Sequence, residues 1–121
     1  MKKLEVGLCQ GRHEMPVTDF VFMNEVNPLD VRGLESKAEA SLLRLLGLAA
    51  DESREQAVHV EIYVSGLTVA LVAAMNVCMA YRWLLTLWHY NRETGTYFPQ
   101  DVGYLPYGEQ PGGKRNEAPT K

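Results

Sequence analysis

The sequence contains little cysteine and no metal-binding motif. Among its 121 residues only Cys9 and Cys78 are cysteines, and both lie within apolar runs. Two cysteines are too few for the disulfide scaffold of a small secreted domain, and a free thiol in an apolar run packs as a small hydrophobe. No Cys-x-x-Cys or His-x-x-x-His pair occurs. Because zinc sites use such spacings, we expect no metal and no cofactor.

A strong excess of charge of one sign is also missing. The formal net charge is −3, and Lys and Arg form no block in the body of the chain. Proteins that bind duplex DNA or RNA need a basic surface that neutralises many phosphates. The composition therefore excludes a large interface with duplex nucleic acid, but it is compatible with a small, local anion site.

The N-terminal region lacks the apolar core of a signal peptide. Lys2 and Lys3 are followed by the charged residues Glu5, Arg12 and Glu14, which interrupt the apolar residues around them. A secretory signal needs an uninterrupted apolar run of about 7–15 residues. We therefore expect the protein to stay in the cytoplasm.

Long hydrophobic runs are absent, with the exception of the uncharged stretch from Ile62 to Tyr81. A helix of about 20 apolar residues spans a bilayer, so a membrane segment is one interpretation. The stretch begins with β-branched and aromatic residues, however, turns through Ser65-Gly66 and contains Asn76. These features favour a strand that runs through a tight turn into a buried helix, and we expect no membrane as a partner.

The periodicity of apolar residues predicts one α/β domain, because a chain of this length builds one hydrophobic core. Spacings of three and four predict a helix that begins after the N-cap Asp30 and stops at Gly47. Residues 1–102 are expected to form the domain, and 103–121, rich in Gly, Pro and charge, a flexible tail. The other predicted elements are strands at Lys3 to Cys9, Val58 to Val64, Trp83 to His89 and Thr96 to Val102, a short extended segment at Phe20 to Val26, and a buried helix at Leu67 to Ala80.

Three turns are predicted to meet at one edge of the sheet. Strands and helices that alternate with short connections are typical of a parallel sheet, and right-handed crossovers place the strand-to-helix turns on one edge. Open α/β sheets bind ligands at this carboxyl edge. If the strands that end at Cys9, Val64 and His89 are parallel neighbours, their turns lie close together. These turns are residues 10–13, 65–68 and 89–92.

The three turns carry the side chains of an anion site. A helix N-terminus presents free N–H groups to a phosphate, and a glycine lets the ligand approach the backbone. Hydroxyls donate hydrogen bonds, guanidinium groups neutralise phosphate, and side-chain amides recognise a base or a ribose. The candidate ligand-binding residues are Gln10, Arg12, Ser65, Gly66, Thr68, Asn91 and Arg92, and the candidates for catalytic proton transfer are His13 and His89.

Each of these residues also has a structural interpretation. Ser65 and Thr68 are typical helix caps, and the Ser-Gly-x-Thr turn lacks the Lys of a Walker loop. His89 follows Trp88 at a strand end, where a structural histidine is equally common. The aromatic residues of the hairpin can stack on bases, but their alternation favours packing of a sheet face or a dimer seam. The case for a site therefore depends on the convergence of the turns.

The segment from Ile62 to Thr68, followed by a helix of small residues, resembles the strand-turn-helix of CRISPR-associated Rossmann-fold (CARF-type) proteins. Ser65, Gly66 and Thr68 match the Thr/Ser-Gly-x-Thr turn of that family, and the resemblance is confined to residues 58–79. It implies a Rossmann-like, usually dimeric domain of antiviral defence that holds a cyclic oligoadenylate across its two-fold axis. Some members cleave this ligand slowly as ring nucleases. The chain departs from the expected pattern at Tyr81-Arg82, where we expect a helix-ending glycine.

We therefore expect a small, three-layer, Rossmann-like α/β domain with a mainly parallel sheet and a C-terminal β-hairpin. The first functional hypothesis is a homodimer that binds a nucleotide at the carboxyl edge of the sheet. Its ligand would be a cyclic oligonucleotide or another phosphate-bearing small molecule, and any reaction a metal-free phosphodiester cleavage. The alternative is a non-enzymatic interaction or scaffold protein of phage or mobile-element origin, assembled through its apolar helix and aromatic hairpin.

Overall fold

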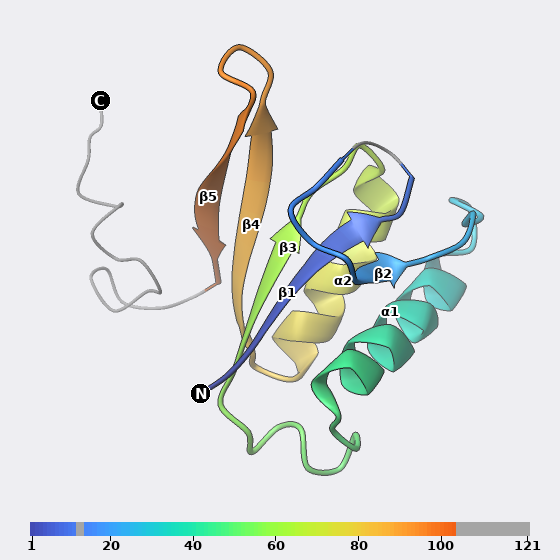
Figure 1. The fold of residues 1–121 in the computed structure, drawn as a ribbon. Coiled ribbons are helices and arrows are strands. Elements are labelled where there is room, and N and C mark those ends of the chain that lie inside the picture. The colour runs from blue at the N-terminus through green and yellow to red at the C-terminus, as the bar shows by residue number, and fades with distance from the viewer. Residues whose placement is uncertain (12–13, 104–121) are drawn as a thin grey trace.

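The described residues form an α/β fold of five strands and two helices (Figure 1). The computed structural model describes residues 1–11 and 14–103. Arg12, His13 and the predicted tail from residue 104 onward lie outside the described residues. The predicted elements are confirmed, although β2 is shorter than expected and β4 longer. In chain order they are β1 (Lys2–Cys9), β2 (Phe20–Phe22), α1 (Val31–Leu46), β3 (Val58–Tyr63), α2 (Thr68–Ala80), β4 (Leu84–Asn91) and β5 (Thr96–Val102).

The strands form one mixed sheet in the order β2-β1-β3-β4-β5. β1 pairs in parallel with β2 and with β3, and β3 pairs in parallel with β4. β5 returns antiparallel to β4, which confirms the predicted hairpin. β2, whose partner the sequence does not predict, pairs with β1 so that Phe20 lies opposite Gly7. A Cβ at Gly7 would lie 2.5 Å from the Phe20 ring, so glycine permits this close approach.

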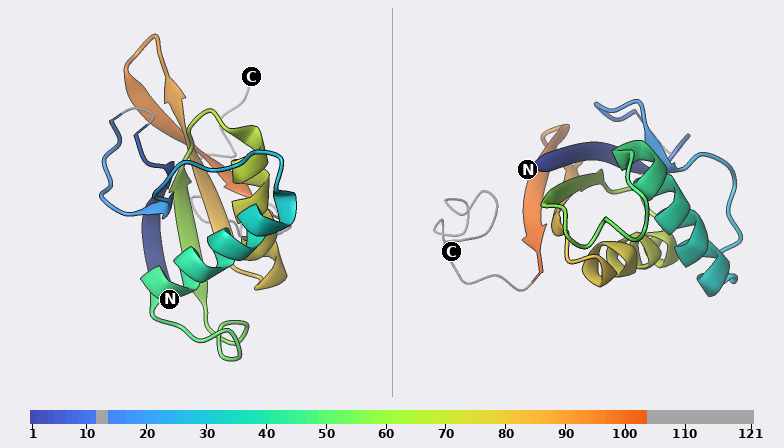
Figure 2. Two further views of the ribbon diagram at one scale, coloured as in Figure 1. Left: turned by 90° about the vertical axis from the view of Figure 1, so that its right-hand side faces the viewer. Right: turned by 90° about the horizontal axis from the view of Figure 1, so that it is seen from below.

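Both helices pack on the same face of the sheet (Figures 1 and 2). They contact each other there, and Asn76 Nδ2 on α2 donates a 2.8 Å hydrogen bond to Glu35 Oε2 on α1. The crossovers from β2 to β3 and from β3 to β4 advance in the same direction across the sheet, so right-handed connections place both helices on one side. The described residues form two layers, and the expected three-layer arrangement is not confirmed.

α2 is an uncharged helix that meets the rest of the protein through small residues. Ala70, Ala73, Ala74 and Cys78 are buried on its inner surface. Small side chains let a helix lie close to the apolar residues of a sheet, which fill the core between them. Burial raises the pKa of the Cys78 thiol to about 12, so this cysteine is an inert core residue, as predicted. Neither helix in residues 1–11 and 14–103 is long and apolar enough to cross a membrane.

α1 has caps at both of its termini, whereas α2 ends without a glycine cap. As predicted, Asp30 accepts a hydrogen bond from an N–H of the first turn of α1, and Gly47 ends α1 with a left-handed φ of 70°. α2 has no such glycine, and Arg82 takes a positive φ of 60° just after it. Tyr81 and Trp83 on either side are buried, and their rings stack with centroids 4.8 Å apart. This packing holds a conformation that costs a non-glycine residue about 1 kcal/mol or more.

The sheet face opposite the helices carries a buried carboxylate. Glu61 on β3 accepts hydrogen bonds from Lys3 Nζ at 2.9 Å and from Trp88 Nε1 at 2.7 Å. Burial by itself disfavours the charged carboxylate, but the hydrogen bonds from Lys3 and Trp88 outweigh this effect and hold the pKa of Glu61 below its ordinary value. Glu61 therefore connects β1, β3 and β4 through its side chain.

Substitution of Glu61 with glutamine should lower the free energy of unfolding at neutral pH. It should also make the free energy of unfolding less dependent on pH in the acidic range. A carboxyl group whose pKa is lower in the folded protein stabilises the fold above its unfolded pKa, and this stabilisation is lost as the pH falls through the folded pKa. The wild type should thus lose more stability than Glu61→Gln as the pH falls. Urea denaturation at a series of acidic and neutral pH values measures this difference.

The control for this experiment is Glu5→Gln. The Glu5 carboxylate lies 3.9 Å from the same Lys3 Nζ, but its side chain is about half exposed. Exposed ion pairs contribute little to stability, so this variant should follow the pH dependence of the wild type. Parallel pH profiles for the wild type and Glu61→Gln would contradict the role assigned to Glu61.

Candidate functional site

The carboxyl ends of β1 and β3 lie at the point where the connections of the chain diverge. β1 leads to β2 on one side of this point, whereas β3 leads through α2 to β4 on the other side. In open α/β sheets ligands bind outside the carboxyl ends of the strands. Gln10 directly follows β1 at this edge, and Ser65 follows β3.

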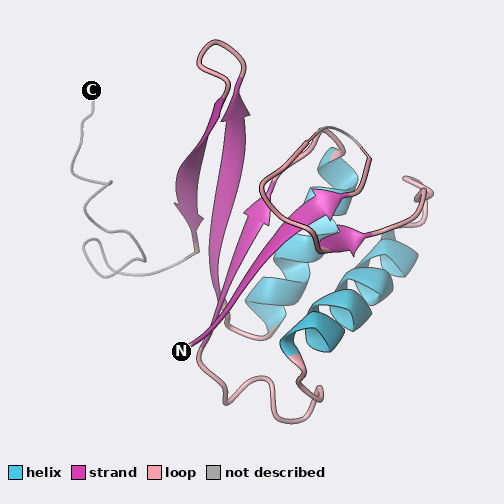
Figure 3. Cartoon of the chain, viewed as in Figure 1, coloured by secondary structure: helices cyan, strands magenta, loops and turns pink. Residues whose placement is uncertain are grey.

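A short turn leads from β3 into α2 (Figure 3). The start of α2 has no side-chain cap. The Val64 N–H donates a 2.9 Å hydrogen bond to β4, and the Leu67 N–H donates to the Ser65 carbonyl oxygen at 2.8 Å. A Cβ at Gly66 would meet no atom within 4 Å, so this position faces open space. Leu67 is the N-cap, and it makes no side-chain cap hydrogen bond. No side chain of this turn therefore caps the first N–H groups of α2, and N–H groups at a helix start are typical anion donors.

Ser65 places a buried hydroxyl without a hydrogen-bond partner in this turn. The residue is 4% exposed, and among the described residues its Oγ has no partner. Most buried polar side chains are hydrogen-bonded, and an unsatisfied one costs about 1–3 kcal/mol. Ser53, which is also buried, shows the usual arrangement, because its Oγ donates to the Ala49 carbonyl oxygen at 2.6 Å. The Ser65 hydroxyl thus carries a cost that a hydrogen-bonding ligand would remove.

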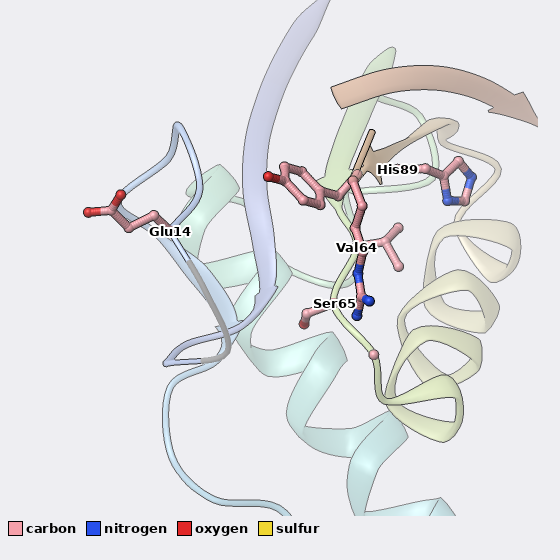
Figure 4. Close-up of a pocket in the computed structure, with 7 residues that line it drawn as sticks. Glu14, Val64, Ser65 and His89 are labelled. Atoms are coloured by element: carbon pink, nitrogen blue, oxygen red, sulfur yellow. The ribbon is translucent and has the colours of Figure 1, made fainter. Parts of the chain in front are cut away.

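Ser65 lines a pocket of about 660 Å³ between the β3–α2 turn and the end of β4. In Figure 4, Val64 and Ser65 lie between Glu14 and His89, and the Glu14 carboxylate points away from Ser65. Small-molecule sites have volumes of about 300–1,000 Å³, so this pocket has room for more than a bare ion. Its lining residues are Glu14, Val64, Ser65, Gly66, His89, Tyr90 and Arg92.

The pocket offers positive charge and hydrogen-bond donors. Arg92 contributes a guanidinium group, and His89 contributes an imidazole. His89 Nε2 lies 2.8 Å from Gln100 Oε1, and since a carbonyl oxygen only accepts, Nε2 carries a proton in this arrangement. The His89 ring also packs on Phe98, with centroids 5.4 Å apart. His89 therefore has structural partners in the hairpin while it lines the pocket.

No metal centre accompanies these groups in the described part of the chain. In residues 1–11 and 14–103, no three His, Cys, Asp or Glu side chains are placed to hold a metal ion. The chemistry that this part of the pocket offers is therefore the binding of an anion by N–H groups, a hydroxyl and a guanidinium.

The structure brings together four of the residues that the sequence predicts for the site. Ser65, Gly66, His89 and Arg92 line the same pocket, although they come from two different turns. The interpretation of Ser65 and Thr68 as helix caps is wrong, because Leu67 is the N-cap of α2 and no side chain caps this helix. Ser65 thus has no hydrogen-bonding role in the fold among the described residues.

Three of the other predicted site residues, which the structure describes, do not line this pocket. Gln10 lines a neighbouring depression at the end of β1. Thr68 is exposed on the first turn of α2 and is not among the lining residues. The Asn91 side-chain oxygen accepts a 2.9 Å hydrogen bond from a backbone N–H in the hairpin turn. Arg12 and His13 belong to the residues that the structure does not describe.

Tyr90 and Glu14 also line the pocket. The sequence favours packing for Tyr90, as one of the hairpin aromatics, and does not indicate Glu14. β4 continues to Asn91, beyond the predicted strand end at His89, so Tyr90 lies on the strand. Extending the alternating pattern to Asn91 would have shown that Tyr90 belongs to the sheet at this edge. No pattern around Glu14 indicates its position, which depends on the path of the chain between β1 and β2.

Comparisons with protein-family models, with curated proteins and with solved structures found no match to this chain.

Replacement of Ser65 with alanine should stabilise the free protein, in contrast to most substitutions of buried residues. The change removes a buried hydroxyl that has no partner in residues 1–11 and 14–103, which should raise the free energy of unfolding by about 1 kcal/mol. Ser53→Ala is the matched control, because it removes a hydroxyl that donates a hydrogen bond and should lower the free energy of unfolding by about 1 kcal/mol. Urea denaturation of both variants measures these changes, and equal losses of stability would contradict the unsatisfied state of Ser65.

Proposed function

We propose that the protein binds a phosphate-bearing small ligand of the nucleotide class at the carboxyl edge of its sheet. The observation that carries this proposal is the buried Ser65 hydroxyl, which has no partner in the described part of the chain and lies directly before the uncapped start of α2. A phosphate oxygen can accept hydrogen bonds from a hydroxyl and from the N–H groups of a helix N-terminus at the same time. The phosphate thus satisfies donors that the protein itself leaves unused.

Two further residues of the pocket support this function. Arg92 presents a guanidinium group that can bind two phosphate oxygens at once. Gly66 has open space where a side chain would be, so the ligand can approach the backbone of the turn. In this proposal Ser65 and the start of α2 position the phosphate, and Arg92 neutralises its charge.

The resemblance to CARF-type proteins adds a class of ligand to this proposal. In that family the matching turn belongs to a Rossmann-like domain that holds a cyclic oligoadenylate. Within the proposal, β1, β3, α2 and β4 are the Rossmann-like part of the fold, and cyclic oligoadenylates stand beside linear nucleotides as ligands. Ser65 and Arg92 support a phosphate group in the pocket, and a panel of ligands distinguishes cyclic oligoadenylates from linear nucleotides.

A panel of ligands tests the proposal directly. Thermal unfolding and calorimetric titration with AMP, ADP, cyclic AMP and cyclic oligoadenylates should show stabilisation by at least one of them, because a ligand at about 100 times its Kd stabilises the folded state by about 2.7 kcal/mol. Gly66→Leu should weaken binding of that ligand at least tenfold, since its side chain would project from the turn that the phosphate approaches. A Cβ at Gly66 meets no other atom, so this variant should keep the stability of the wild type.

The control variant is Ala40→Leu, which enlarges an exposed position on α1 outside the pocket. It should leave the affinity unchanged. If no member of the panel binds at millimolar concentration, or if Gly66→Leu binds as tightly as the wild type, the proposed site is wrong.

A second candidate function is self-association through α2, and the outer surface of this helix favours it. Val72 and Met79 are 46% and 61% exposed, and α2 carries no charged side chain. Exposed apolar surface of this kind is typical of interfaces between proteins. The second copy of this chain would supply a matching uncharged helix, as in an isologous dimer.

Light scattering after size-exclusion chromatography tests self-association. The wild type should elute as a dimer, and the double variant Val72→Glu/Met79→Glu should elute as a folded monomer, because burial of two carboxylates between the helices is costly. Ala40→Glu adds a charge to an exposed position of α1 and should remain a dimer. A wild-type monomer at high micromolar concentration would rule out this candidate.

A further inference from the structure

Tyr90 presents an exposed aromatic ring in the pocket to which the proposed function assigns the phosphate. The residue is 45% exposed and lines the pocket together with Ser65 and Arg92. We propose that Tyr90 is the stacking platform for the nucleobase of the ligand, so that the pocket selects nucleotides over sugar phosphates. This inference rests on the proposed function, because it needs a phosphate at Ser65 to bring the base into place.

The other aromatic residues on this side of the sheet pack against one another. Tyr63 stacks on Trp88 with ring centroids 5.7 Å apart and an interplanar angle of 11°. Tyr97 meets Tyr63 edge to face, with centroids 5.0 Å apart. Tyr63 is only 8% exposed, so its ring is part of the packed surface of the sheet. Of the hairpin aromatics for which the sequence favours packing, Tyr97 packs against another ring of the sheet face.

Trp88, Tyr63, Tyr97 and Tyr90 form a row in which each ring contacts the next. Tyr90 is the last ring of this row, and it lines the pocket. Its centroid is 5.2 Å from that of Tyr97, and the two rings are tilted by 59°. A tilted contact of this kind is typical of aromatic pairs and fixes the direction of the ring. Tyr97 thereby orients Tyr90, and the row is anchored at Trp88, whose Nε1 donates to the buried Glu61.

A ring that is held in place before the ligand arrives makes an effective stacking surface. Binding then costs less side-chain ordering than it does with a mobile ring. Stacking of a base on an aromatic side chain tolerates all bases, because each base has a π-face. The pocket, at about 660 Å³, has room for a base and a ribose in addition to the phosphate. Tyr90 therefore discriminates between ligands with and without a base.

Two ligands that differ only in the base test this inference. AMP and ribose 5-phosphate carry the same phosphate and sugar, and calorimetric titration gives the affinity of each for the full-length protein. The wild type should bind AMP at least tenfold more tightly than ribose 5-phosphate, and Tyr90→Ala should remove most of this preference by weakening AMP alone. Tyr90→Phe retains an aromatic face and should keep the preference.

Phe98→Ala is the matched control, since Phe98 is an equally exposed aromatic residue of the same hairpin that does not line the pocket. The ratio of the two affinities should be unchanged in this variant. If Tyr90→Ala weakens both ligands equally, or neither, the stacking role is wrong while the phosphate site stands. If neither ligand binds the wild type, the proposed function fails for nucleoside monophosphates, and this inference fails with it.

Discussion

The burial of α2 is the constraint on which the rest of the structure depends. A helix without a charged side chain has to be covered, and its alanines allow it to lie close to both the sheet and α1. This packing fixes the crossover from β3 to β4, and with it the parallel pairing of these strands. The carboxyl ends of β3 and β4 therefore meet at one edge, where Ser65 and Gly66 of the β3–α2 turn line one pocket with His89 and Arg92.

Most elements of the fold could be predicted because their signals are local. Asp30 and Gly47 mark the ends of α1 by their capping chemistry, and alternation marks the strands. The partner of β2 and the placement of both helices on one face could not be predicted, because they depend on contacts between residues far apart in the chain. The end of α2 was missed for a related reason. Arg82 holds a left-handed conformation only because the stacked rings of Tyr81 and Trp83 fix the chain on either side of it.

The sequence predicts which turns meet at the candidate site, because the order and direction of the strands determine where the turns lie. Parallel strands bring their carboxyl ends together, which places Ser65, Gly66, His89 and Arg92 around one pocket. Topology does not determine which way each side chain points. For this reason it did not reveal that the side-chain oxygen of Asn91 accepts a hydrogen bond within the hairpin turn, nor that the Ser65 hydroxyl is buried with no partner among the described side chains and backbone groups. That missing hydrogen bond can be seen only in three dimensions, yet it is the feature that most strongly indicates a ligand.

The most direct test of the central claim is an NMR titration of the ¹⁵N-labelled protein with AMP, followed through the backbone amide resonances. If a phosphate binds at the β3–α2 turn, the backbone N–H groups of Gly66, Leu67 and Thr68 lie next to it or donate hydrogen bonds to it, and their resonances should shift with a common saturation curve. The amide resonances of residues at the C-terminal end of α2 should not shift. If these three resonances stay fixed at saturating ligand, or if the shifts map to another part of the protein, the β3–α2 turn is not a phosphate site.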